Sequence, residues 1–107
     1  MRVDGKSKLV RDRIPEIIRS AGAEPVVYTA GLVEYRRRLR DKLGEEVTEF
    51  LAADETKAPE ELADVLEVVQ ALATELGIDP AQLEKIRAAK ARERGGFADR
   101  IIWTGNR

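Results

Sequence analysis

Acidic side chains recur in two short clusters near the middle of the chain. The carboxylates are Glu45, Glu46 and Glu49 in the first cluster, and Glu61 and Asp64 in the second. Within each cluster two carboxylates are three residues apart, so in a helix they would lie on adjacent turns of one face. Carboxylates that converge repel one another, and a divalent cation relieves that repulsion. The spacing therefore favours a metal site built from carboxylate oxygens.

Two helices are expected to carry these clusters. The first runs from about Leu32 to about Asp54, and the second from about Pro59 to Leu76, where Gly77 ends it. Apolar residues at helical spacing predict the buried faces, which comprise Leu39, Leu43, Val47, Phe50 and Leu51 in the first helix and Leu62, Val65, Leu66, Val69, Leu72, Ala73 and Leu76 in the second. Because four of the carboxylates border these faces, antiparallel packing would bring Glu46, Glu49, Glu61 and Asp64 together.

The available ligand types restrict the metal. The chain contains no His and no Cys, which excludes Cys/His zinc sites, disulfides and acid–base schemes that depend on His. A site made only of oxygen ligands suits a hard cation, and Mg²⁺ is the natural choice for phosphate chemistry, with Mn²⁺ as the alternative. A different interpretation stays open, because 20 acidic residues in 107 would place some E-x-x-E patterns on solvated faces by chance.

The remaining patterns complete an all-α fold. A short helix is expected from Pro15 to near Gly22, and a last helix from the cap Asp79 to about Arg94, where two glycines end it. Residues 25–28 are β-prone and could pair with residues 100–103. We expect one domain spanning residues 1–107, an antiparallel helix bundle completed by oligomerisation, because a domain this small buries only a modest core.

Two basic residues near the end of the last helix are candidate phosphate contacts. Lys90 and Arg94 are four residues apart and share one face of that helix. Both could bind phosphate oxygens. The competing interpretation is that basic side chains are favoured at helix C-termini by the helix dipole.

The overall composition excludes several classes of partner. A net charge of -1 provides no basic field for nucleic acid. No apolar run approaches the roughly 18 residues that span a bilayer. The opening residues 1–6 lack the apolar region of a signal peptide. We therefore expect a cytoplasmic protein that binds neither nucleic acid nor membranes.

The acidic motif resembles a known signature. Glu45-Glu46-x-x-Glu49, followed after eleven residues by Glu61-x-x-Asp64, is similar to the E-E-x-x-E…E-x-x-D pattern of the all-α nucleotide pyrophosphohydrolase superfamily, which includes MazG-like enzymes and phosphoribosyl-ATP pyrophosphohydrolases. The opening segment Lys8–Ile18 and the closing segment Lys90–Phe97 resemble a short MazG-like group.

The resemblance implies a hydrolase that splits the bond between the α and β phosphates of a nucleoside triphosphate, giving a monophosphate and pyrophosphate. Such enzymes serve the house-cleaning of abnormal nucleotides, and commonly form homodimers or homotetramers. Carried over by position, Glu46, Glu49, Glu61 and Asp64 would bind Mg²⁺. Either Glu45 or Glu49 would be catalytic, as the general base that activates water.

Two alternatives stay open. The phosphoribosyl-ATP branch usually has a Tyr-His pair after the second acidic motif, whereas this chain has Val65–Gln70 there and no His, which argues against that substrate. A helical interaction or regulatory module without catalysis could also keep the fold. The sequence does not choose the base or the sugar.

Overall fold

The computed structural model describes residues 7–107, and the opening residues on which the signal-peptide argument rests lie outside this range. Four helices follow one another along the chain: α1 (Ile14–Ser20), α2 (Leu32–Ala52), α3 (Ala58–Glu75) and α4 (Pro80–Arg94). The described part of the chain contains no strand. The expected all-helical class is confirmed, and every helix begins and ends within about two residues of its predicted limits.

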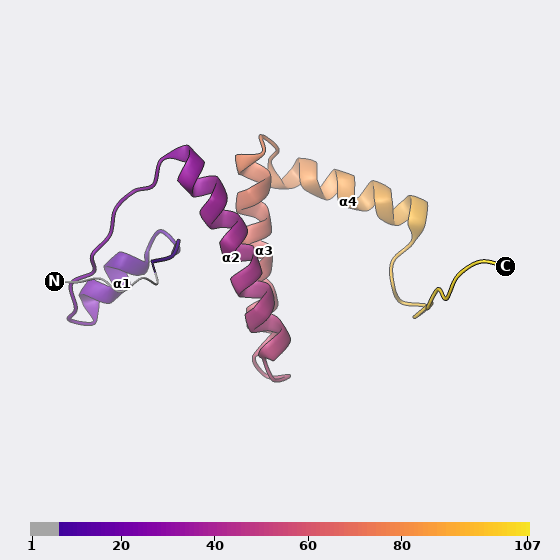
Figure 1. Ribbon diagram of the computed structural model, residues 1–107, viewed down its shortest axis with the longest axis horizontal. Helices are drawn as coiled ribbons and strands as arrows, with labels where there is room; N and C mark the ends of the chain where they lie inside the picture. The colour runs from indigo at the N-terminus through magenta and orange to yellow at the C-terminus, as the bar shows by residue number, and fades with distance from the viewer. Residues whose placement is uncertain (1–6) are drawn as a thin grey trace.

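The centre of the molecule is an antiparallel pair formed by α2 and α3 (Figure 1). Asp54 shapes the turn between them, since its Oδ1 accepts hydrogen bonds from the backbone N–H groups of Thr56 and Lys57, both at 3.0 Å, and from the Thr56 hydroxyl at 2.6 Å. At the other end of the pair, Arg36 of α2 forms an ion pair with Glu75 of α3. These contacts hold the two helices in the register that positions their acidic residues.

The start and end of α4 follow directly from its sequence. Asp79 accepts a hydrogen bond from the backbone N–H of Gln82, and the Gln82 side chain accepts one from the backbone N–H of Asp79, both at 2.8 Å. This reciprocal capping box satisfies two donors that a helix start otherwise leaves unpaired. Gly95 ends the helix with a φ of 81°, a conformation that favours glycine.

The buried core is small and lies between α2 and α3. Its buried apolar residues are Leu39, Val68 and Ala73, and Glu46 is buried as well, with 6% of its surface exposed. The face of α2 that meets α3 therefore runs through Glu46. Part of the predicted apolar face is exposed in the single chain instead, including Val47 and Leu51 of α2, Leu62 and Leu66 of α3, and Leu76 directly after α3.

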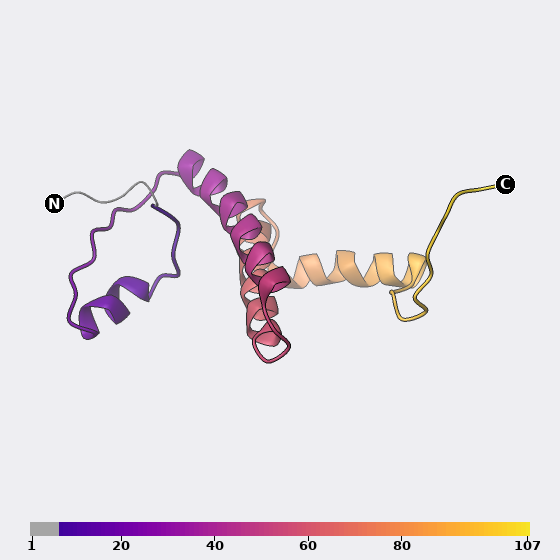
Figure 2. The ribbon, with the colours of Figure 1, turned by 60° about the horizontal axis from the view of Figure 1, so that its bottom comes forward.

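The helices flanking the central pair extend away from it. Figures 1 and 2 show α1 on one side of the pair and α4 reaching out on the other. The radius of gyration is 18.1 Å, whereas a compact domain of this length has about 13 Å. Such an open chain leaves large apolar side chains exposed, among them Leu32, Val33, Phe97, Ile101, Ile102 and Trp103. Completion of the bundle by oligomerisation remains a prediction.

The expected pairing of residues 25–28 with residues 100–103 is wrong for this chain. Neither segment is a strand. Residues 25–28 lie on the α1 side, whereas α4 carries the C-terminal segment to the opposite end of the molecule (Figure 1). The two segments are therefore too far apart to pair as strands, although both are β-prone in composition.

No helix within residues 7–107 combines the length and the apolar character needed to cross a bilayer.

Candidate metal centre

Three of the predicted ligands converge where α2 packs against α3. Glu46 of α2, and Glu61 and Asp64 of α3, each offer one carboxylate oxygen, and these oxygens all lie within 4.8 Å of one another. Glu61 and Asp64 are on adjacent turns of α3, as the sequence predicts for residues three apart. The antiparallel register of the two helices brings Glu46 to them.

The carboxylates of this cluster are poorly satisfied by the protein itself. Within the described residues, Glu46 Oε2 and Glu61 Oε2 are buried without a hydrogen-bond partner. Burial raises the pKa of Glu46, Lys42 opposes this effect, and the negative charges of Glu49 and Asp64 add to it. Buried acceptors without partners are costly. A cation bound by these carboxylate oxygens would satisfy them.

The donor set fits a hard divalent cation. Carboxylate oxygens are the ligands that Mg²⁺ and Mn²⁺ prefer, and Mg²⁺ is usually held by a few carboxylates together with water and substrate phosphates. Three close carboxylates, two of them with an unpartnered buried oxygen, provide such a site.

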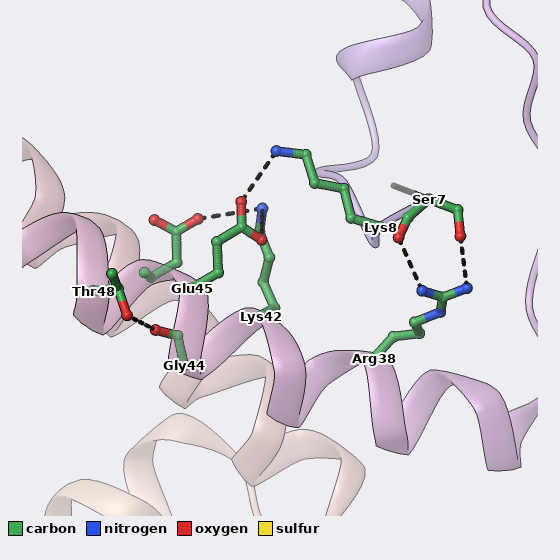
Figure 3. Close-up of polar contacts among 8 residues, drawn as sticks. Ser7, Lys8, Arg38, Lys42, Gly44, Glu45 and Thr48 are labelled. Atoms are coloured by element: carbon green, nitrogen blue, oxygen red, sulfur yellow. Dashed lines mark hydrogen bonds and ion pairs between the residues drawn. The ribbon is translucent and has the colours of Figure 1, made fainter. Parts of the chain in front are cut away.

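Two lysines neutralise part of the negative charge on α2. Lys42 is one turn before Glu45 and Glu46, and its Nζ lies 3.4 Å from Glu45 Oε2 and 3.3 Å from Glu46 Oε1. Lys8 reaches from the segment before α1, and its Nζ is 3.0 Å from Glu45 Oε1 (Figure 3). Partial burial opposes ionisation of Glu45, but the bonds and charges of the two lysines together lower its pKa. Glu45 is therefore a weak base.

An arginine contacts the cluster from the same N-terminal segment. Arg11 Nη2 is 2.6 Å from Asp64 Oδ1, although the two residues are 53 positions apart in the sequence. The segment is also held to α2 at Ser7, whose carbonyl and hydroxyl oxygens each accept a hydrogen bond of 3.0 Å from the Arg38 guanidinium (Figure 3). The N-terminal segment thus lies across both central helices.

A cavity of about 520 Å³ opens beside the cluster. One wall comes from the N-terminal segment and α1, and the other from α2 and α3. Its polar lining includes Arg11, Lys42, Glu46 and Asp64, and its apolar lining includes Leu9, Ile14, Ile17, Tyr35, Val68 and Ala71. The volume falls within the range of about 300 to 1,000 Å³ that is usual for small-molecule sites. A lining that contains both charged and apolar side chains suits a ligand with one charged and one apolar part.

The other predicted site residues lie at different distances from this centre. Glu49 is exposed on α2 and stands outside the converging three, but its charge still acts on Glu46 and Lys8. Lys90 and Arg94 do not line the cavity. Both are exposed near the far end of α4, which leads away from the central pair (Figure 2). Within one chain, these two residues are not brought to the carboxylates.

Three further residues contact the carboxylates, although their place in the sequence predicted no site role for them, namely Lys8, Arg11 and Lys42. Lys42 could have been found, because it precedes Glu46 by four residues and such pairs meet on a helix surface. Lys8 and Arg11 reach the site through the irregular segment before α1. No local spacing rule predicts which helix such a segment crosses.

Comparison with known proteins gives one family and one relative. The model of the family described as phosphoribosyl-ATP pyrophosphohydrolase matches residues 13–91, about three quarters of the chain. A protein of Mycolicibacterium smegmatis described as uncharacterized is 54% identical over 48 residues, which are 45% of this chain and 49% of that protein. The match therefore spans about half the length of this curated relative. No solved structure matches the chain.

Proposed function

The chain belongs to the phosphoribosyl-ATP pyrophosphohydrolase family, and from that premise we propose that it is a Mg²⁺-dependent nucleoside triphosphate pyrophosphohydrolase. The family supports hydrolysis of a phosphoric anhydride. The finer proposal is cleavage between the α and β phosphates of NTPs or dNTPs, with a role in the house-cleaning of abnormal nucleotides. The observation that carries it is the convergence of Glu46, Glu61 and Asp64 beside a cavity of nucleotide-compatible size.

The residues proposed to hold Mg²⁺ are Glu46, Glu61 and Asp64, whose oxygens converge, and Glu49 would be either a fourth ligand or the general base. When bound, the ion supplies neutralisation of phosphate charge and activation of a water molecule. Lys42 keeps the α2 carboxylates oriented from one turn away. Glu46 is already fixed by burial, so little ordering entropy remains to be lost when it binds a ligand.

The chemical step requires a base for the attacking water. Glu45 is engaged by Lys8 and Lys42, and its lowered pKa makes it a weak proton acceptor. We therefore favour Glu49 over Glu45 as the general base. The water gives its proton to that carboxylate, and its oxygen bonds to one phosphorus of the α–β linkage. The bridging oxygen leaves with the other phosphorus, so the products are a nucleoside monophosphate and pyrophosphate.

Lys90 and Arg94 remain proposed phosphate contacts, and they require a second copy of the chain. Since α4 leads away from the cavity of its own chain, only α4 of another copy could bring these residues to the phosphates. A homodimer or homotetramer would supply this contact and would also cover exposed apolar residues such as Leu62, Leu66 and Phe97.

Phosphoribosyl-ATP is the second candidate substrate, because the matching family is described by that activity. The same carboxylates would perform the same bond cleavage on it. The absence of His from this chain argues against it, since the Tyr-His pair usual in that branch has no counterpart at residues 65–70.

The test is a pyrophosphate-release assay over NTPs, dNTPs, damaged nucleotides and phosphoribosyl-ATP, with and without Mg²⁺. Wild type would be compared with Glu61→Gln and Glu49→Gln, and with Glu93→Gln as the matched control on α4. We expect Mg²⁺-dependent release that is lost in the first two variants and retained in the control. Release from phosphoribosyl-ATP alone would establish the second candidate. No release from any compound by the folded protein would favour a non-catalytic helical interaction module.

A further inference from the structure

The segment before α1 contacts both central helices through its polar side chains. Arg38 of α2 binds Ser7, Lys8 pairs with Glu45 of α2, and Arg11 pairs with Asp64 of α3. Of these contacts, the one made by Arg11 falls on a carboxylate of the converging cluster. The guanidinium therefore lies beside the position where a cation would be held.

The Arg11–Asp64 pair is close but exchangeable. Its N–O distance is 2.6 Å, whereas 56% of the Arg11 side chain and 39% of the Asp64 side chain are exposed. Exposed pairs of this kind contribute little free energy, because water screens both charges. Arg11 also lies outside any helix and is exposed. A competing cation at Asp64 can therefore displace the guanidinium at low cost.

A displaced guanidinium needs another anion. Arginine does not lose its charge at accessible pH, and its planar fork matches the oxygens of a phosphate group. A cation held at Asp64 would attract the phosphates of a substrate, and Arg11 lines the cavity beside Asp64. We propose that Arg11 is a phosphate-binding residue, which neutralises Asp64 in the absence of a cation and binds the phosphates of the substrate once a cation takes Asp64.

The lining of the cavity supports this role. Arg11 lines it together with Lys42, Glu46 and Asp64, and Leu9 of the same segment and Ile14 of α1 line it as well. A phosphate chain held at Arg11 would leave apolar lining residues available to the nucleoside. The inference rests on the proposed function, and inorganic pyrophosphate, a product of the proposed reaction, is the probe that contains the phosphate groups without the nucleoside.

Two titrations test the role of Arg11 without any nucleotide hydrolysis. The first measures Mn²⁺ affinity by electron paramagnetic resonance in the absence of phosphate. The second measures pyrophosphate affinity by calorimetry at saturating Mg²⁺. Wild type would be compared with Arg11→Gln and Arg11→Lys. The matched control is Arg19→Gln, which removes an equally exposed arginine of α1 that pairs with Glu24 and does not line the cavity.

Opposite shifts are expected in Arg11→Gln. Removing the competing charge should tighten Mn²⁺ binding roughly twofold to fivefold, the range that an exposed pair supports. Losing a charge-assisted bidentate contact should weaken pyrophosphate binding on the order of tenfold or more. Arg11→Lys should keep the Mn²⁺ affinity of wild type and show an intermediate pyrophosphate affinity, and Arg19→Gln should match wild type in both titrations.

Pyrophosphate affinity equal to wild type in both Arg11 variants would overturn the inference. So would parallel losses in both titrations in Arg11→Gln together with an unchanged Arg11→Lys, since these would mean that Arg11 only supports the fold. The nucleotide assay judges the proposed function separately. If no nucleotide is cleaved but Arg11→Gln still shows the opposite shifts, the phosphate site stands and the proposed reaction fails.

Discussion

Replacing Glu46 by Gln should change the stability of the protein in opposite directions with and without a divalent cation. Glu46 is 6% exposed, its Oε2 has no partner within the described residues, and its Oε1 is 3.3 Å from Lys42. The buried carboxylate costs more than the neutral amide that replaces it, because its charge is desolvated and lies near the charges of Glu49 and Asp64. This difference is on the order of 1–3 kcal/mol, and loss of the helix pair with Lys42 offsets about 0.3–0.5 kcal/mol of it. In chelator, Glu46→Gln should therefore be about 1–2 kcal/mol more stable than wild type.

A bound cation should reverse this order. A ligand at a hundred times its Kd stabilises the folded state by about 2.7 kcal/mol. Wild type should gain that amount, whereas Glu46→Gln loses a charged ligand and should gain little. At saturating Mg²⁺ wild type should then be about 1 kcal/mol more stable than the variant. The exposed Glu93→Gln should show neither effect.

Urea denaturation in EDTA and in Mg²⁺ measures both differences. A Glu46→Gln variant less stable than wild type in chelator would refute this prediction, because the protein itself would then stabilise the charge of the buried carboxylate. A gain in chelator combined with no response of wild type to any divalent ion would also contradict the metal site. That result would favour the interaction module.

Three further perturbations test the fold. Leu39→Ala removes the most buried leucine of α2 and should lower the free energy of unfolding in urea by about 2–5 kcal/mol; a loss below that of an exposed-site variant would contradict the described core. Asp79→Ala removes the cap of α4 and should cost about 0.5–2 kcal/mol, seen as reduced helicity by circular dichroism; unchanged helicity would argue against the capping box. Hydrogen bonds from the Thr56 side chain and then from the backbone of Lys57 lower the pKa of Asp54. Its contribution is therefore present above the unfolded value of about 3.8 and lost as pH falls through the folded value, so the stability advantage over Asp54→Asn should be constant near neutrality and shrink in acid.

The limits of the helices could be predicted from the sequence because their signals are local. Asp79 and Gln82 form the predicted capping box, and Gly95 takes the positive φ that ends α4. These signals lie within a few residues of the boundary they set. The convergence of Glu46 with Glu61 and Asp64 was predictable for a related reason, since helical periodicity fixes which side chains border an apolar face.

The arrangement of the helices could be predicted only in part. Antiparallel packing of α2 on α3 follows from their short connection and apolar faces, but the same apolar composition did not show that α1 and α4 would lie apart from that pair. The helical spacing of Leu62 and Leu66 predicted that both are core residues, yet they are exposed in the single chain. Periodicity shows that a face is apolar and does not identify what covers it.

The contacts of the N-terminal segment were beyond sequence reasoning. Arg11 and Asp64 are 53 positions apart in the sequence. The chain between them includes irregular segments, and no rule of residue spacing predicts their conformation. The placement of Glu49 shows a related limit. It is three residues from Glu46, but the 60° between them on the helix is enough to leave it exposed while Glu46 is buried.

The measurement that tests the central claim most directly is ³¹P NMR of the reaction products. A nucleoside triphosphate that passes the release assay, or phosphoribosyl-ATP, would be incubated with wild type in Mg²⁺ and in EDTA, beside Asp64→Asn. The account predicts resonances of a monophosphate and pyrophosphate that appear only with Mg²⁺ and only with wild type. A diphosphate with orthophosphate, or equal turnover by Asp64→Asn, would contradict it.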